Sequence, residues 1–148
     1  MIVPYHTAYV LDASVAFKWF TTRQEPDKHA ALALRERHAS GQCRLIVPEF
    51  FFLEILNVIR FHTQATEEDA AHALVFLEQL NLRVEPVTWD LLRKNNAISW
   101  SYGVAVYDAA YVALAEVVGF PLVTADDALV KKMRGHSIVL RLKDLRFS

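Results

Sequence analysis

The sequence contains little of the chemistry that stabilises small secreted domains or zinc modules. Cys43 is the only cysteine in 148 residues, so an intramolecular disulfide is impossible and zinc held by a cysteine cluster is excluded. A single thiol suits a reducing compartment, and we expect a cytoplasmic protein. The N-terminal segment has no basic region ahead of a long apolar core, so it does not read as a signal peptide.

Linkers, repeats and membrane spans are also missing. Four glycines and five prolines are few, and we expect one domain over residues 1–148, long enough to bury a core. The most apolar long window, residues 104–123, carries Asp108, Glu116 and Pro121, which argues against a membrane span. The net charge of −1 does not itself indicate a nucleic-acid partner, whereas a mean hydropathy of +0.17 leaves apolar surface for a protein interface.

Short apolar runs alternate with longer helical patterns along the chain. Such alternation implies crossover connections and a parallel sheet, and strands that are apolar throughout are typical of a sheet covered on both faces. We therefore expect a three-layer α/β/α sandwich around a parallel sheet of about five strands. Strands are predicted at residues 9–11, 45–47, 83–87, 122–124 and 137–140. Helices are predicted at residues 14–20, 27–39, 50–62, 66–80, 88–102, 106–118 and 128–133, the last ending before Gly135.

Four acids occupy positions that this topology brings together. Asp12 and Asp126 follow the first and fourth strands, at the sheet edge where α/β domains bind ligands. Glu54 and Asp108 lie within apolar helical segments, where an unpaired carboxylate costs several kcal/mol, of the order of ~5. Oxygen ligands gathered around one point suit Mg²⁺ or Mn²⁺ better than zinc.

Each acid also has an ordinary structural explanation. Asp12, Asp108 and the pair Asp126–Asp127 are all placed to cap helices. Glu54 can pair with Arg60 or with a distant lysine.

The remaining motifs give weaker signals. The six histidines form no metal-binding pair at helical spacing, and we expect most of them at the surface. The chain has no phosphate-binding glycine loop, no dinucleotide fingerprint and no nucleophile elbow. The aromatic cluster in residues 49–52 is more typical of a core or an interface than of a stacking platform.

Four segments together resemble the PIN domain, in particular the VapC type of toxin nuclease. They are VLDASVAFKW, PEFFFLEILNVIR, VYDAAYVALAEVVGFPLVTAD and KKMRG, and they span nearly the whole chain. Four features of spacing are shared with that family. An Asp follows the first strand, with a Ser two residues later, and a Glu is followed three residues later by an Asn. A Tyr-Asp-Ala sequence begins a helix, and a Thr-x-Asp sequence follows a strand.

The resemblance implies a metal-dependent ribonuclease with an acidic cluster. Asp12, Glu54, Asp108 and Asp126 match the four acids. Ser14, Asn57 and Thr124 match the polar residues that support them. It also implies homodimers and a small antitoxin that blocks the site. Asp127 departs from the pattern, because relatives often carry a basic or polar residue there.

We expect Asp12, Asp108 and Asp126 to be the principal metal ligands, with Glu54 binding a second ion or orienting the water. Without these four acids the formal charge rises from −1 to +3, so the remaining surface is mildly basic. Candidate phosphate contacts are Lys18, Arg23, Arg60, Lys131, Lys132 and Arg134.

Three other functions fit less well. An aspartate-based phosphatase needs an acid two residues after its nucleophile, and that position is Ser14. A receiver-like module needs an acceptor Asp after the third strand, where the chain has Val87-Thr88. A catalytically silent PIN-like scaffold is the remaining alternative, although all four acids are present.

Overall fold

The computed structural model describes residues 7–62, 64–134 and 136–146. Gly135, which was expected to end the last helix, and His6 lie outside the described residues. Five parallel strands form one sheet in the order β3-β2-β1-β4-β5. Their bounds are β1 Ala8–Leu11, β2 Arg44–Pro48, β3 Arg83–Glu85, β4 Leu122–Thr124 and β5 Val139–Arg141.

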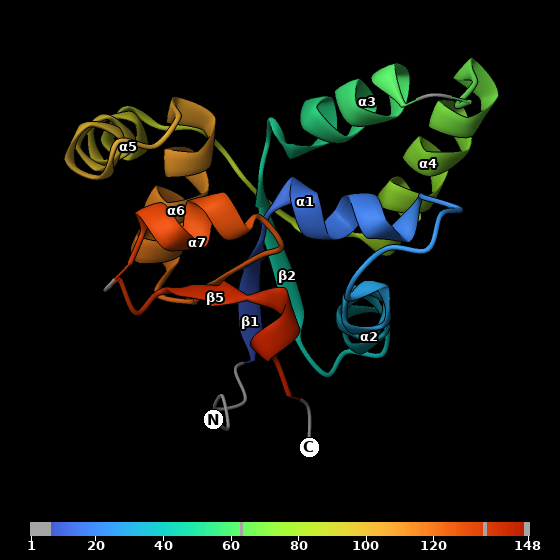
Figure 1. Cartoon of the computed structure of the whole chain (residues 1–148), viewed down its shortest axis with the longest axis horizontal. Coiled ribbons are helices and arrows are strands. Elements are labelled where there is room, and N and C mark those ends of the chain that lie inside the picture. Colours follow the sequence, from blue (N-terminus) through green and yellow to red (C-terminus); the bar gives the residue numbers. More distant parts are fainter. Residues whose placement is uncertain (1–6, 63, 135, 147–148) are drawn as a thin grey trace.

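Helices cover both faces of the sheet (Figure 1). The helices α1 to α4 lie on one side, and α5 to α7 lie on the other, as right-handed crossovers require when the strand order reverses direction. The expected three-layer α/β/α sandwich is therefore confirmed. The helix bounds are α1 Ala13–Ala16, α2 Lys28–Ala39, α3 Phe51–Phe61, α4 Glu67–Leu80, α5 Trp89–Tyr102, α6 Val106–Val118 and α7 Asp127–Lys132, with short 3₁₀ turns η1 Phe17–Trp19 and η2 Leu142–Asp144.

The core is packed on the two central strands and on α6. Val10, Leu11 and Val123 are fully buried, as expected for strands covered on both faces. In α6 the run Ala109–Ala115 is buried throughout, because this helix lies between the sheet and α5. No single helix in the described part of the chain is long and apolar enough to cross a membrane; α5 and α6 meet that standard only as a pair bent by 118°.

Several predicted boundaries are confirmed by their caps. Thr66 caps α4 through a reciprocal pair of bonds with Asp69, and Thr88 caps α5. Gly103 and Gly119 end α5 and α6 in the left-handed conformation that glycine adopts without strain.

Other boundaries were wrong for identifiable reasons. The helix expected at residues 14–20 divides into α1 and the tighter turn η1. The strand expected to reach Val87 ends at Glu85, because Pro86 has no N–H to donate to the sheet. The fifth strand lies at Val139–Arg141 instead of 137–140, and α2 begins at Lys28 because Asp27 adopts a left-handed conformation (φ 60°).

The expectation that most histidines lie at the surface does not hold for His38. Its ring is buried, with Nδ1 accepting from the Leu45 N–H at 3.0 Å. This bond makes Nε2 the protonated nitrogen, which donates to the Leu80 carbonyl at 2.8 Å. His38 therefore joins α2, β2 and the end of α4.

Candidate active site

The strand order places two of the four acids on either side of the point where the topology reverses. The chain runs outward from β1 through β2 to β3, and then returns to the other side of β1 as β4 and β5. Asp12 follows β1 and Asp126 follows β4, so both stand at the carboxyl edge of neighbouring strands. This is the position at which parallel α/β sheets bind ligands.

Asp12 is buried and is held by two hydroxyl groups. Ser14 and Thr124 each donate to its Oδ2 at 2.7 Å. The side chain makes no capping bond to α1, although Asp12 is the residue that precedes this helix. The capping explanation for the Asp12 carboxylate is therefore wrong, and the expected support by Ser14 is confirmed.

The same hydroxyls tie β1 to the turn after β4. Ser14 Oγ accepts from the Ala125 N–H at 3.0 Å, and Thr124 Oγ1 accepts from the Asp126 N–H at 3.1 Å. Thr124 thereby fixes the turn that aims Asp126, as the sequence predicted. Thr124 itself is fully buried.

The two carboxylate oxygens of Asp126 differ in their hydrogen bonding. Oδ1 accepts from the N–H groups of Ala128 and Leu129, at 3.0 and 3.1 Å, and so caps α7. These bonds leave Oδ2 for another partner. Asp127 stands in the first turn of α7, exposed, and pairs with Arg141 at 3.1 Å.

Glu54 pairs with a tyrosine and not with a basic residue. The hydroxyl of Tyr111 donates to Oε1 of Glu54 at 2.7 Å, from α6 to α3. Arg60, the partner in the alternative explanation for Glu54, instead stacks over the Phe61 ring at 5.3 Å. This contact of Tyr111 with the site was not expected from the sequence. The available signal was its spacing, since it lies three residues after Asp108 and so on the same helix face.

Asp108 lies in the first turn of α6, half-buried. The residue that caps this helix is Ala105, so the capping explanation for Asp108 is also wrong. Its charge near a helix N-terminus is favoured by the helix dipole.

Burial and mutual repulsion make the ionised cluster unfavourable. Burial is the largest cause that raises the pKa of Asp12, Glu54 and Asp108. The charge of Asp126 raises the pKa of Asp12 and Asp108 further, and the charges of Asp12 and Asp108 do the same for Glu54. The hydroxyl donors of Asp12, the Tyr111 hydroxyl beside Glu54 and the charge of Lys132 near Asp108 act in the opposite direction.

The donor chemistry fits a hard divalent cation. The four acids offer only oxygen ligands, and their mutual repulsion is what a bound cation relieves. Within the described residues, however, no three acidic, histidine or cysteine side chains are already arranged closely enough to hold a metal ion.

Two expected contacts are not found in the described part of the chain. Asn57 is exposed and makes no described hydrogen bond to an acid. Lys18, a candidate phosphate contact, is buried; its ammonium donates to the Pro26 carbonyl at 2.7 Å and pairs with Glu25 at 3.7 Å. It holds the segment between η1 and α2 in place.

The family model described as the PIN domain matches residues 9–134. The chain therefore belongs to the PIN domain family. It is 49% identical over 127 residues to Ribonuclease VapC3 of Pyrobaculum aerophilum, an alignment that covers 83% of this chain and 92% of that relative. The resemblance to the VapC type of PIN domain is confirmed.

Solved structures share the fold at much lower identity. A toxin–antitoxin complex from Klebsiella pneumoniae matches with a TM-score of 0.68 and 14% identity, covering 90% of this chain and 97% of that one. DNA-bound VapBC from Salmonella typhimurium matches with a TM-score of 0.67 and 14% identity, covering 93% and 99%. PIN-domain ribonucleases of the VapC type are generally dependent on divalent metals.

Proposed function

We propose that the chain is a divalent-metal-dependent endoribonuclease and the toxin of a toxin–antitoxin pair. The observation that carries the proposal is the four-acid cluster at the topological switch point, in a chain 49% identical to a ribonuclease. None of the described ion pairs involves one of the four acids, so their negative charge is available to a cation. We propose a cytoplasmic location, because an RNA substrate is available there.

Asp12, Asp108 and Asp126 would hold the metal, with Mg²⁺ or Mn²⁺ as the ion. A divalent cation at this position activates water for attack on a phosphodiester and neutralises the charge that builds on the phosphate oxygens. Ser14 and Thr124 hold Oδ2 of Asp12, and Oδ1 would be the oxygen that binds the cation. Asp126 keeps Oδ2 for the same purpose while Oδ1 caps α7.

Glu54 would bind a second ion or orient the attacking water. The Tyr111 bond fixes the direction of its carboxylate and favours the ionised form, which is the form that accepts a proton from water. Tyr111 is thus a positioning residue for Glu54.

The phosphatase alternative gains no support from the site. Ser14, which stands where that mechanism needs a carboxylic acid, donates its own proton to Asp12. A silent scaffold would not need acids placed so that their charges raise the pKa values of Asp12, Glu54 and Asp108.

The test is cleavage of RNA by purified protein with Mg²⁺, with Mn²⁺ and with EDTA. Activity should require the metal and be abolished by Asp12→Asn and by Asp108→Asn. Cleavage that persists in the double variant would mean that the activity is a contaminant or that the site is wrong. Expression with and without the antitoxin, followed by mapping of new RNA 5′ ends, identifies the substrate.

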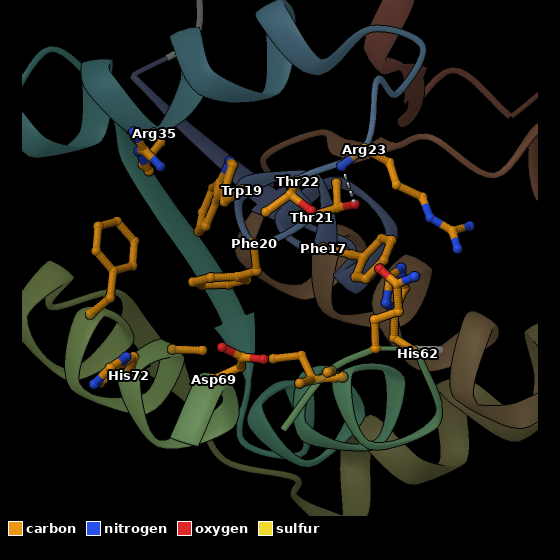
Figure 2. A pocket seen from close by; sticks show the side chains of 15 residues that line it. Phe17, Trp19, Phe20, Thr21, Thr22, Arg23, Arg35, His62, Asp69 and His72 are labelled. Carbon is orange, nitrogen blue, oxygen red and sulfur yellow. Dashed lines mark hydrogen bonds between the residues drawn. The ribbon is translucent and has the colours of Figure 1, made fainter. Parts of the chain in front are cut away.

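The antitoxin has a candidate docking site in a cavity of about 490 Å³ between η1 and α4. Figure 2 shows Trp19 and Phe20 on one side of this cavity, with Asp69 and His72 of α4 on the other. Arg35 stacks over the Phe76 ring at 5.2 Å at its rim. An apolar wall with a cationic rim suits a peptide with apolar side chains flanked by acids. Arg35→Glu should release the antitoxin and leave RNA cleavage unchanged.

A second copy of the chain has a candidate interface on α5. Trp89 and Trp100 are 76% and 84% exposed, and their spacing of eleven residues places them on one helix face, with Leu92 between them. Exposed tryptophans on one face are typical of protein interfaces. We assign this face to a homodimer.

A further inference from the structure

A second cavity, of about 560 Å³, lies between α7 and β5. The side chains that line this α7–β5 cleft include the cations Lys131, Arg134 and Arg141, together with His136 and one acid, Asp127. Three permanent positive charges against one negative charge make the cleft attractive to anions.

The cleft adjoins the acidic site through the sheet. Arg141 is the residue opposite Thr124 in the β4–β5 register, and the Thr124 hydroxyl binds Asp12. Neighbouring strands are about 4.8 Å apart, so the Arg141 backbone lies one strand from the hydrogen-bond network of the site. On the α7 side, Asp127 directly follows the proposed metal ligand Asp126.

Only part of the Arg141 guanidinium has a described hydrogen-bond partner. Its Nη2 donates to Oδ1 of Asp127 at 3.1 Å. Its Nε is shielded from solvent and has no hydrogen-bond partner among the described residues. A shielded donor without a partner is unfavourable, and an arginine presents several N–H groups in a fork that matches phosphate.

We propose that the α7–β5 cleft binds a backbone phosphate of single-stranded RNA next to the phosphodiester that is cut, with Arg141 as its main contact. The proposal rests on the proposed ribonuclease function and adds a substrate-binding site to it. An acidic site repels a polyanion, and cations beside it supply the attraction that holds the strand. The position of the cleft at the site favours RNA over an acidic peptide.

Asp127 lowers the affinity of the α7–β5 cleft for phosphate, because its carboxylate competes with the phosphate for Arg141. Removing its charge frees the guanidinium and makes the cleft more positive. Changes at Asp127 and at Arg141 should therefore shift RNA affinity in opposite directions.

The experiment measures binding of a fluorescent single-stranded oligoribonucleotide by anisotropy, in EDTA and over a range of salt. Arg141→Gln should weaken binding about tenfold at low salt and reduce the salt slope by about 0.7, the value for one phosphate contact on a single strand. Asp127→Asn should tighten binding. Arg83→Gln is the matched control, because Arg83 also pairs with an acid, Glu85, at 2.6 Å but lies on β3 at the opposite edge of the sheet; it should stay within about twofold of the wild type.

Cleavage by the wild type, measured in parallel with Mg²⁺, distinguishes a failure of the proposed ribonuclease function from a failure of the proposed phosphate-binding cleft. If the wild type cleaves RNA and Arg141→Gln binds it as tightly as Arg83→Gln does, the cleft is not a substrate site although the proposed function stands. If the wild type neither binds nor cleaves RNA, the proposed function fails and this inference fails with it. Loss of polyglutamate binding in Arg141→Gln with unchanged RNA affinity would assign the cleft to an acidic peptide and overturn the proposal.

Discussion

The hydroxyl of Tyr111 donates a 2.7 Å hydrogen bond to Oε1 of Glu54 across 57 residues of sequence, and this bond joins α6 to α3 at the acidic site. Tyr111→Phe removes the donor and keeps the buried ring. The pKa of Glu54 should then rise further, because the Tyr111 bond is one of the influences that lower it. The acid limb of the pH–rate profile should move to higher pH, and cleavage should fall by about 10–100-fold.

Tyr107→Phe is the control for this change, since Tyr107 lies on the same helix but is 64% exposed and contacts the Phe50 ring. It should leave the profile in place. A Tyr111→Phe protein with a wild-type profile would show that the bond does not act on catalysis.

The metal-free protein should become more stable as the pH falls from neutral. Asp12, Glu54 and Asp108 have pKa values above their ordinary values in the folded chain, so the folded state binds protons more readily than the unfolded state just above the usual carboxyl range. This contribution to the stability of the folded state is lost as the pH rises through the raised pKa values of the three acids. Unfolding by urea between about pH 5 and 8 measures it.

Asp108→Asn should flatten that pH dependence and raise the Tm of the metal-free protein by a few degrees, because the repulsion with Asp12 and Asp126 is removed. Mg²⁺ should raise the Tm of the wild type and have little effect on the variant. Asp90→Asn, at an exposed surface pair, provides the comparison. A variant that Mg²⁺ still stabilises as it does the wild type would remove Asp108 from the metal site.

Asp126 and Asp127 should behave differently when replaced. Asp126→Ala loses the α7 cap, at about 1 kcal/mol, and should also abolish cleavage. Asp126→Asn keeps a good capping residue but lacks the charge, so it should retain stability and still fail to cleave. Asp127→Ala should cleave almost normally. Full activity in Asp126→Asn, or its loss in Asp127→Ala, would mean that the wrong neighbour was assigned to the metal.

The α5 face should control the oligomeric state. Trp100→Glu places a charge in the proposed dimer interface and should give a monomer by sedimentation, with an unchanged circular dichroism spectrum because the side chain is 84% exposed. Phe61→Glu, at an exposed aromatic on α3, is the matched control and should leave the mass unchanged. A dimer that survives Trp100→Glu combined with Trp89→Glu does not use this face.

The parts of the fold that the sequence predicted depend on local chemistry. The bounds of α6 and β4 are as expected, because Gly119 and Pro121 separate a helical from an extended pattern within three residues. The positions of Asp12 and Asp126 also follow from local reading, since each comes directly after an apolar strand.

The parts that could not be predicted depend on contacts between distant segments. The burial of Lys18 depends on the path of the chain to the Pro26 carbonyl, and that of His38 on a carbonyl 42 residues away. The partner of Glu54 was missed for the same reason: helical spacing shows which residues share a face, and it does not show which face of another helix they meet. The ion pair of Asp127 with Arg141 is likewise a tertiary contact.

The hydrogen bonds from Ser14 and Thr124 to Asp12 affect the order in which the site assembles during synthesis of the chain. β1 emerges from the ribosome before β4, because Thr124 follows Asp12 by 112 residues. A nascent chain therefore carries an incomplete set of acids until β4 has been made and inserted beside β1. For an enzyme that cuts RNA, this order of assembly delays activity until β4 has joined the sheet.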